Sequence, residues 1–204
     1  DLTARGCRIY GLQDRPAEGQ SGPLTEIDPF TFFSAFNRGL TYANNTHLLR
    51  NLKELLGLHS ATPSDFDGIP TVQAQNSWFF PYAYERKPTD IPTLWTLAKA
   101  AVQQGPGGLS ADNFQRALQV KKIGIAKLTM GLFWLNSDAF LALDSRMSSL
   151  LTNQGLEPSI STLDEYRKLI ASVQQTLTPD FASLSLQAYT CLLYTSDAAD
   201  DDAC

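Results

Sequence analysis

The stretch that decides the fold reads VKKIGIAKLTMGLFWLN and covers residues 120–136. Within it, large apolar residues recur at spacings of three and four, at Ile125, Leu128, Leu132 and Leu135. This is the period of one face of an α-helix. Residues 130–135 form the most apolar run of the chain. The stretch therefore predicts a central, largely buried helix, with a cluster of lysines at its start.

Three more helices are predicted before this stretch, the first from a start signal and the other two from apolar stripes. Asp28-Pro29 is typical of a helix start, because Asp caps the first turn and Pro fits the first helical position. Residues 48–56 carry a leucine stripe of helical period that ends at Gly57, where a helix C-terminus favours glycine. A similar stripe over residues 94–102 ends at the glycine-rich residues 105–108. These signals predict three helices upstream of the central one.

Four more helix starts lie close to or beyond the central stretch. Ser110 can cap a short helix just before it, and Asp144 can cap one just after it. Residues 161–164 form a further capping signal, and apolar residues of helical spacing follow as far as residue 177. Thr178-Pro179 predicts the start of a last helix.

Residues 68–84 are the exception to this helical pattern. Residues 71–73 and 77–80 contain β-branched and aromatic side chains, and they could pair as a short hairpin around residues 74–76. Thr62-Pro63 predicts one capped helical turn before them. The expected fold is mainly α, with about seven helices in one compact helical domain and a short β-hairpin near residues 71–80. We expect one core to contain Phe33, Phe36, Leu52, Leu132 and Trp134.

Composition excludes some classes of protein. The chain has 204 residues, of which 43% are hydrophobic and 18% are charged, so it can bury a core and is not globally disordered. No apolar run approaches the roughly 20 residues of a membrane-spanning helix. With 16 basic and 21 acidic residues, the formal net charge is −5.

The last residues distort this charge. Residues 191–200 read CLLYTSDAAD, which resembles a translated sequencing-library adapter, so we interpret residues 191–204 as a non-native tail; a natural acidic tail is the alternative. Without the tail, 17 acidic residues face 16 basic ones, and Cys7 is the one cysteine left. A single cysteine is typical of the reducing cytoplasm, which is the expected location.

The common catalytic and metal-binding motifs are missing. Residues 105–108 lack the lysine of a phosphate-binding loop, and no Cys-x-x-Cys or His-Glu-x-x-His is present. His47 and His59 have no partner cysteines. We therefore expect this part of the protein to be non-catalytic, with no metal site.

Two groups of residues remain as candidates for binding. Residues 78–82 read WFFPY and precede Arg86 and Asp90. They could stack a base or an adenine ring beside the arginine. They could equally form a hydrophobic plug of the core, with Arg86 and Asp90 as an ion pair.

The second group surrounds the start of the central helix. The sequence KKIGIAK over residues 121–127, followed by an Asp twenty residues after the glycine, resembles the helix-hairpin-helix of DNA glycosylase-like domains. In that motif, a Gly-hydrophobic-Gly hairpin offers backbone N–H groups to a DNA phosphate, and an Asp follows the second helix. By this resemblance, the DNA-contacting residues are Lys121, Lys122, Gly124, Lys127, Asp144 and Arg146. The alternatives are a solvated basic face and a structural helix cap at Asp144.

A longer resemblance joins several blocks in order. Residues 27–38, 64–70, 77–80, 128–134 and 143–146, together with Arg86 and Asp90-Ile91, resemble a region of McrB-type AAA+ NTPases, which belong to 5-methylcytosine-specific restriction systems. In that family the region lies N-terminal to the AAA+ module. Within these blocks, the motif residues are Arg38, Asp67, Gly68, Trp78, Phe79, Arg86 and Asp90.

This resemblance implies a division of the chain and a function. Residues 1–27 would be a linker or the end of a preceding element, residues 28–152 a helical upstream domain, and residues 153–190 helices leading to an absent AAA+ module. The upstream domain would recognise DNA or dock on the motor. GTP or ATP with Mg²⁺ would bind only downstream, and a partner nuclease would join through the full-length protein. A helix-hairpin-helix DNA-binding module and a purely structural adaptor are the alternatives.

Overall fold

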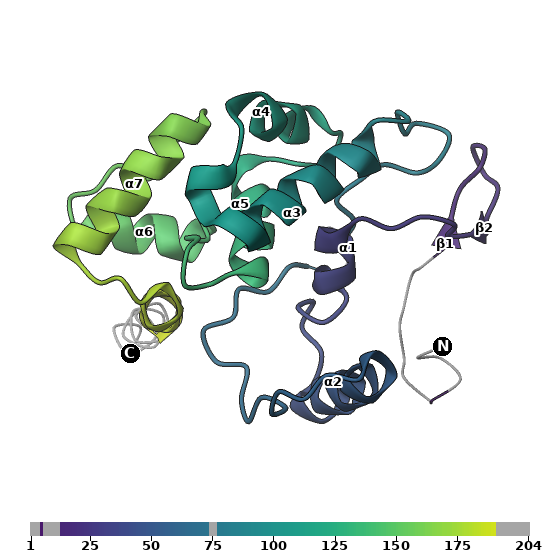
Figure 1. Cartoon of the computed structure of the whole chain (residues 1–204), viewed down its shortest axis with the longest axis horizontal. Helices are drawn as coiled ribbons and strands as arrows, with labels where there is room; N and C mark the ends of the chain where they lie inside the picture. The colour runs from purple at the N-terminus through teal and green to yellow at the C-terminus, as the bar shows by residue number, and fades with distance from the viewer. Residues whose placement is uncertain (1–4, 6–12, 74–76, 191–204) are drawn as a thin grey trace, which may run out of the picture.

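The structure is a computed structural model that describes residue 5, residues 13–73 and residues 77–190. The mainly α prediction is confirmed: these residues form eight helices and a two-stranded sheet. The eighth helix includes residues 181–190 (Figure 1). The other seven are α1 (Pro29–Ser34), α2 (Tyr42–Leu56), α3 (Asp90–Gly108), α4 (Ala111–Gln119), α5 (Ile125–Leu135), α6 (Ser145–Asn153) and α7 (Leu163–Thr176).

Helix α5 lies at the centre of the main core, as its apolar sequence predicts. Helices α1, α3 and α4 all pack against it, and α4 also contacts α7. Leu128 and Leu132 of α5 have no exposed surface. Gly131 lets the ring of Phe30 approach closely, since a Cβ at this position would lie 2.6 Å from the Phe30 Cδ1 atom. The same core extends to α6, α7 and residues 181–190.

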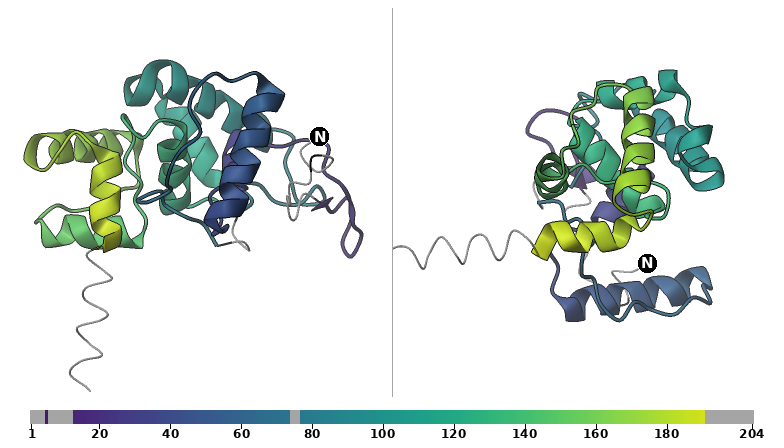
Figure 2. Two further views of the ribbon diagram at one scale, coloured as in Figure 1. Left: turned by 90° about the horizontal axis from the view of Figure 1, so that it is seen from below. Right: turned by 90° about the vertical axis from the view of Figure 1, so that its left-hand side faces the viewer.

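Helix α2 lies apart from this core, and Figure 1 and the right-hand view of Figure 2 show it below the other helices. It packs in a second, smaller cluster built on Phe36 and Leu48, to which Leu52 contributes. The prediction of one core for five residues is therefore wrong for Phe36 and Leu52. Leu132 is in the main core and Trp134 packs against it. Periodicity identifies the apolar face of a helix, but it does not say which partner covers that face.

The short hairpin is not where the sequence predicts it. Strands β1 (Gln13–Asp14) and β2 (Gly22–Pro23) pair in antiparallel fashion, whereas residues 71–73 and 77–80 contain no strand. Their backbone groups bond to the α1 region instead. The Phe79 N–H donates to Thr31 Oγ1 at 2.8 Å, and Val72 N–H donates to the Asn37 carbonyl at 2.8 Å. Residues 74–76, the expected turn, lie outside the described residues.

Helix ends follow the capping signals closely. The side chains of Asp28, Ser110 and Asp144 accept backbone N–H bonds at the starts of α1, α4 and α6. Thr162 and Glu165 form a reciprocal capping box on α7. The predicted turn at Thr62-Pro63 is not helical. The last helix begins at residue 181, where Asp180, not Thr178, accepts the Ser183 N–H at 2.9 Å.

Candidate nucleic-acid interface at the α4–α5 turn

The turn between α4 and α5 leaves the start of α5 open. Lys122 has a φ of 82°, the left-handed region that a residue other than glycine seldom adopts, and this reverses the chain within residues 120–124. Gly124 is the N-cap of α5 and is exposed, and among the described residues this helix start has no side-chain cap hydrogen bond. The free N–H groups and the positive end of the helix dipole therefore face an open surface.

The three lysines of this turn lie in different surroundings. Lys121 is exposed and its Nζ lies 2.6 Å from a carboxylate oxygen of Glu85. Lys122 is also exposed, and its Nζ lies 4.7 Å from the ring centroid of Tyr82. Lys127 is half-buried, and its Nζ donates to the carbonyl oxygens of Trp78 and Lys122. Lys127 therefore positions the turn, whereas Lys121 and Lys122 are exposed cations, of which Lys121 is paired with Glu85.

Burial also changes the acid–base behaviour of Lys127. Burial and the nearby charge of Lys122 lower the pKa of the Lys127 ammonium, the carboxylate of Asp28 raises it, and the net result is a pKa of about 8. The Nζ lies 4.8 Å from the ring centroid of Phe79. Asp28 itself is fully buried, and burial raises its pKa to about 6. A buried acid and a half-buried base thus lie behind the turn.

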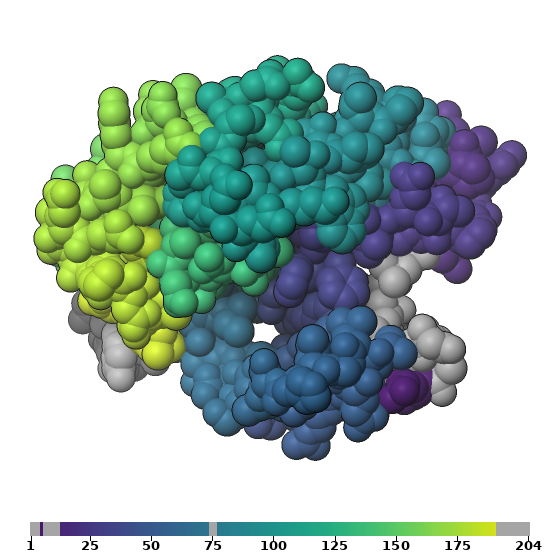
Figure 3. All heavy atoms as spheres, viewed as in Figure 1, coloured from purple at the N-terminus to yellow at the C-terminus, as the bar shows by residue number. Residues whose placement is uncertain are grey.

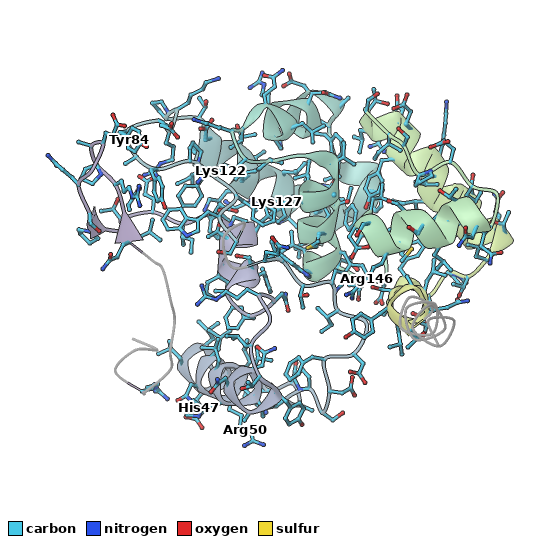
Figure 4. The ribbon with its side chains drawn as sticks, turned by 180° about the vertical axis from the view of Figure 1, so that it is seen from behind. His47, Arg50, Tyr84, Lys122, Lys127 and Arg146 are labelled. Carbon is cyan, nitrogen blue, oxygen red and sulfur yellow. The ribbon has the colours of Figure 1, made fainter. Side chains whose placement is uncertain are left out.

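Aromatic rings and cations alternate next to the turn. The ring of Tyr82 contacts two cations, because its centroid lies 4.6 Å from the guanidinium carbon of Arg15 and 4.7 Å from the ammonium of Lys122. Tyr84 stacks on Tyr82 with a centroid separation of 6.4 Å and is 43% exposed. Figure 4 shows Tyr84, Lys122 and Lys127 in succession on the same side of the molecule. We call Arg15, Tyr82, Tyr84, Lys121 and Lys122 the turn patch.

A buried ion pair fixes the loop that carries these tyrosines. Arg86 does not pair with Asp90, as the sequence suggests, but with Asp14 at 2.9 Å. Although burial raises the pKa of Asp14, the backbone N–H groups of Ala83 and Arg15 and the Arg86 guanidinium lower it below its usual value. Asp90 instead accepts the Lys87 N–H at 3.0 Å. Sequence reasoning missed Asp14, because no local signal links it to a residue 72 positions later.

The blocks of the longer resemblance contact one another around α5. Phe79 stacks on Phe30 at 5.4 Å and meets Trp134 edge-on at 6.0 Å. The Trp134 indole N–H donates to the Pro70 carbonyl at 2.9 Å. Gly68 lies against Leu186, where a Cβ would come within 2.9 Å of the backbone. Phe79 is thus part of the core, as the plug interpretation of the aromatic run expects.

The remaining predicted residues lie elsewhere. Asp144 accepts the Met147 N–H at 2.9 Å and so caps α6. Arg146 extends over the ring of Tyr189 at 4.3 Å, and Figure 4 shows it apart from Lys122 and Lys127. Arg38 is half-buried between α1 and α2, and Asp67 is exposed beside a pocket near α2.

Within the described residues, no group of three His, Cys, Asp or Glu side chains could hold a metal ion. In the same part of the chain, no helix is long and apolar enough to cross a membrane.

No curated protein and no solved structure matches the chain. A family described as "Domain of unknown function (DUF8425)" matches residues 8–191, and the chain belongs to this family.

Proposed function

We propose that this chain is a non-catalytic DNA-contacting region that lies upstream of a McrB-type AAA+ motor, in a modification-dependent restriction system. The observation that carries the proposal is the α4–α5 turn, where the uncapped start of α5 meets two exposed lysines. Backbone N–H groups at a helix start bind phosphate well, and lysine adds charge. The link to a motor rests on the ordered sequence blocks alone.

The contact would be small and local. The chain as a whole has no excess of basic residues, so a broad phosphate-binding surface is not expected. The turn patch instead combines exposed cations with an exposed tyrosine ring. Such a surface suits one or two phosphates and an unpaired base or strand end.

An apolar groove favours motor docking as a second candidate function. A pocket of about 630 Å³ between α1, α3 and α5 is lined mostly by apolar side chains, among them Phe33, Trp95 and Val102. Trp95 and Val102 are 42% and 58% exposed. An exposed apolar surface of this kind is typical of a protein–protein contact. DNA contact at the turn and docking at the groove are compatible, because they use different surfaces.

Salt titration of DNA binding tests the proposal. Lys122→Asn removes the charge while tolerating the left-handed backbone, and Lys121→Ala removes its neighbour. Both variants should bind a short duplex more weakly than the wild type between about 50 and 200 mM salt, and each should reduce the salt slope by about one. Lys168→Ala on α7 is the matched control and should change neither. Equal slopes in all four proteins would contradict contact at the turn.

Nucleotide turnover tests the non-catalytic part of the proposal. We expect the purified chain to hydrolyse neither ATP nor GTP in the presence of Mg²⁺, since its sequence has no phosphate loop and no set of Mg²⁺ ligands. Saturable, metal-dependent hydrolysis by the chain would contradict this.

A further inference from the structure

A pocket beside α2 is lined by aromatic and acidic side chains, unlike the basic turn between α4 and α5. It has a volume of about 440 Å³ and lies between the start of α2 and residues 65–71. Figure 3 shows that residues around α2, in blue, border a hollow below the main body. The pocket is large enough to enclose a single planar heterocycle with part of its sugar.

Aromatic rings form the walls of this pocket. Tyr42 is 56% exposed, yet its hydroxyl donates to the Ser64 carbonyl at 2.7 Å, which fixes the ring. Phe66 meets Tyr42 edge-on, with ring centroids 5.6 Å apart and an interplanar angle of 65°. Phe36 is 6% exposed and also lines the pocket. An exposed ring that is fixed at its tip is a preorganised stacking surface.

The polar groups of the pocket are mostly hydrogen-bond acceptors. Asp65 and Asp67 both line it, and no lysine or arginine is among its lining residues. Asn45 lines it as well, is only 7% exposed, and has a side-chain Oδ1 with no hydrogen-bond partner among the described residues. A buried acceptor without a donor is costly. The exposed carboxylates of Asp65 and Asp67 therefore favour an occupant that supplies N–H donors, and they disfavour phosphate.

We propose that this pocket binds a nucleobase of the guanine type. Guanine is planar, so it can stack on the Tyr42 ring. Its N1–H and N2–H₂ groups are adjacent donors, which match the two oxygens of a carboxylate such as that of Asp67. A neutral base is not repelled by the carboxylates of the pocket, whereas a phosphate group would be. The proposal rests on the proposed function only for the source of the base, which would be DNA held at the turn.

Binding of free nucleosides to the whole chain tests this directly. Guanosine should bind saturably, as followed by the fluorescence or NMR signals of Tyr42. Inosine lacks the N2 amine and adenosine lacks the N1 proton, so both should bind at least about tenfold more weakly. Guanosine 5′-monophosphate should bind more weakly than guanosine, since its phosphate meets two carboxylates.

Variants separate the pocket from a general effect. Asp67→Asn and Tyr42→Leu should each weaken guanosine binding by about tenfold or more, since the first removes the paired charge and the second the ring. Asp164→Asn, an exposed carboxylate on α7, is the matched control and should bind like the wild type. No saturable guanosine binding, or equal binding by all variants, would overturn the proposal.

Two outcomes have separate meanings. If argininamide binds more tightly than guanosine and loses affinity in Asp67→Asn, the pocket receives an arginine of a protein partner and the nucleobase proposal is wrong. The nucleoside assay does not involve Lys122 or duplex DNA. A failure of DNA contact at the turn and a failure of base binding near α2 are therefore distinguishable.

Discussion

At the scale of single residues, Asp28 caps the start of α1 although its carboxylate is fully buried. One carboxylate oxygen accepts the N–H groups of Phe30 and Thr31 at 2.8 and 3.1 Å and so starts α1. The other oxygen is buried and has no hydrogen-bond partner among the described residues. The favourable cap is thus combined with an unfavourable desolvation of the charge.

This conflict makes stability depend on pH. Burial raises the pKa of Asp28 from 3.8 to about 6, so between these values the folded chain binds more protons than the unfolded chain. The contribution of Asp28 to the free energy of unfolding therefore falls as pH rises from about 4 to about 6. Asp28→Asn keeps the cap and removes the charge.

We expect Asp28→Asn to match the wild type near pH 4 and to be more stable near pH 7, by up to about 3 kcal/mol. Urea unfolding at a series of pH values measures the difference. Parallel curves for Asp28→Asn and the wild type would contradict the account of Asp28.

Gly131 gives a second prediction at this scale. Added to α5, a Cβ at residue 131 would lie 2.6 Å from Phe30 Cδ1 and 3.1 Å from Phe79 Cε1. Gly131→Ala should therefore lower the free energy of unfolding by about 1–3 kcal/mol through overpacking. Gly107→Ala, where no heavy atom lies within 4 Å, is the matched control and should be neutral or slightly stabilising. Similar effects of the two changes in thermal unfolding would show that Phe30 can move away.

At the scale of elements, the sequence predicts helix starts far better than long-range partners. A cap is local: Asp28, Ser110, Asp144 and Thr162 each bond to a backbone N–H two or three residues later. The expected hairpin fails because its backbone groups bond to the α1 region, which lies over 30 positions earlier in the chain. No pattern within the residues 71–80 could reveal that competition.

The candidate site shows the same division. The basic α4–α5 turn and the cap of α6 could be predicted, because both depend on residues close in sequence. The Asp14–Arg86 pair and the contacts of Tyr82 with Arg15 and Lys122 could not, since each joins segments far apart in the chain. The pocket beside α2 was missed for the same reason. The sequence identifies Asp67 through the McrB resemblance, but it does not place Asp67 beside Tyr42.

Arg167 provides a prediction at the element scale, since it links two helices. The charged residues 164–168 look like a solvated face, yet the Arg167 guanidinium donates to the carbonyls of Pro106, Gly107 and Leu109 at 3.0, 3.3 and 2.7 Å. These carbonyls lie at the end of α3, beyond the kink at Gly105. Positive charge at a helix C-terminus is favourable.

Arg167→Ala should lower the free energy of unfolding by about 1.5–3 kcal/mol, because it removes charge-assisted bonds to carbonyls at the end of α3. The neighbouring exposed Lys168→Ala should change stability by less than about 0.5 kcal/mol. Chemical denaturation measures both. An equally small effect of the two changes would mean that water replaces the guanidinium at the end of α3.

At the scale of the whole molecule, the two hydrophobic clusters set an order of stability. The main cluster joins α1 and α3–α7 with residues 181–190, and Leu132 at its centre is fully buried. The cluster of α2 has only two buried members, Phe36 and Leu48, and Leu56 at the end of that helix is 57% exposed. Fewer buried apolar contacts mean a lower free energy of local opening.

A comparison of Leu132→Ala with Leu48→Ala tests this order. Leu132→Ala should cost about 2–5 kcal/mol and accelerate amide exchange throughout the main core, because the cavity lies in the unit that unfolds last. Leu48→Ala should accelerate exchange in α2 while the slowest amides of α5 keep their rates. If Leu48→Ala instead speeds exchange in α5 as strongly as in α2, the two clusters open as one unit. Independent opening would also leave the pocket beside α2 free to adapt to an occupant without disturbing the turn, since the two sites would belong to units of different stability.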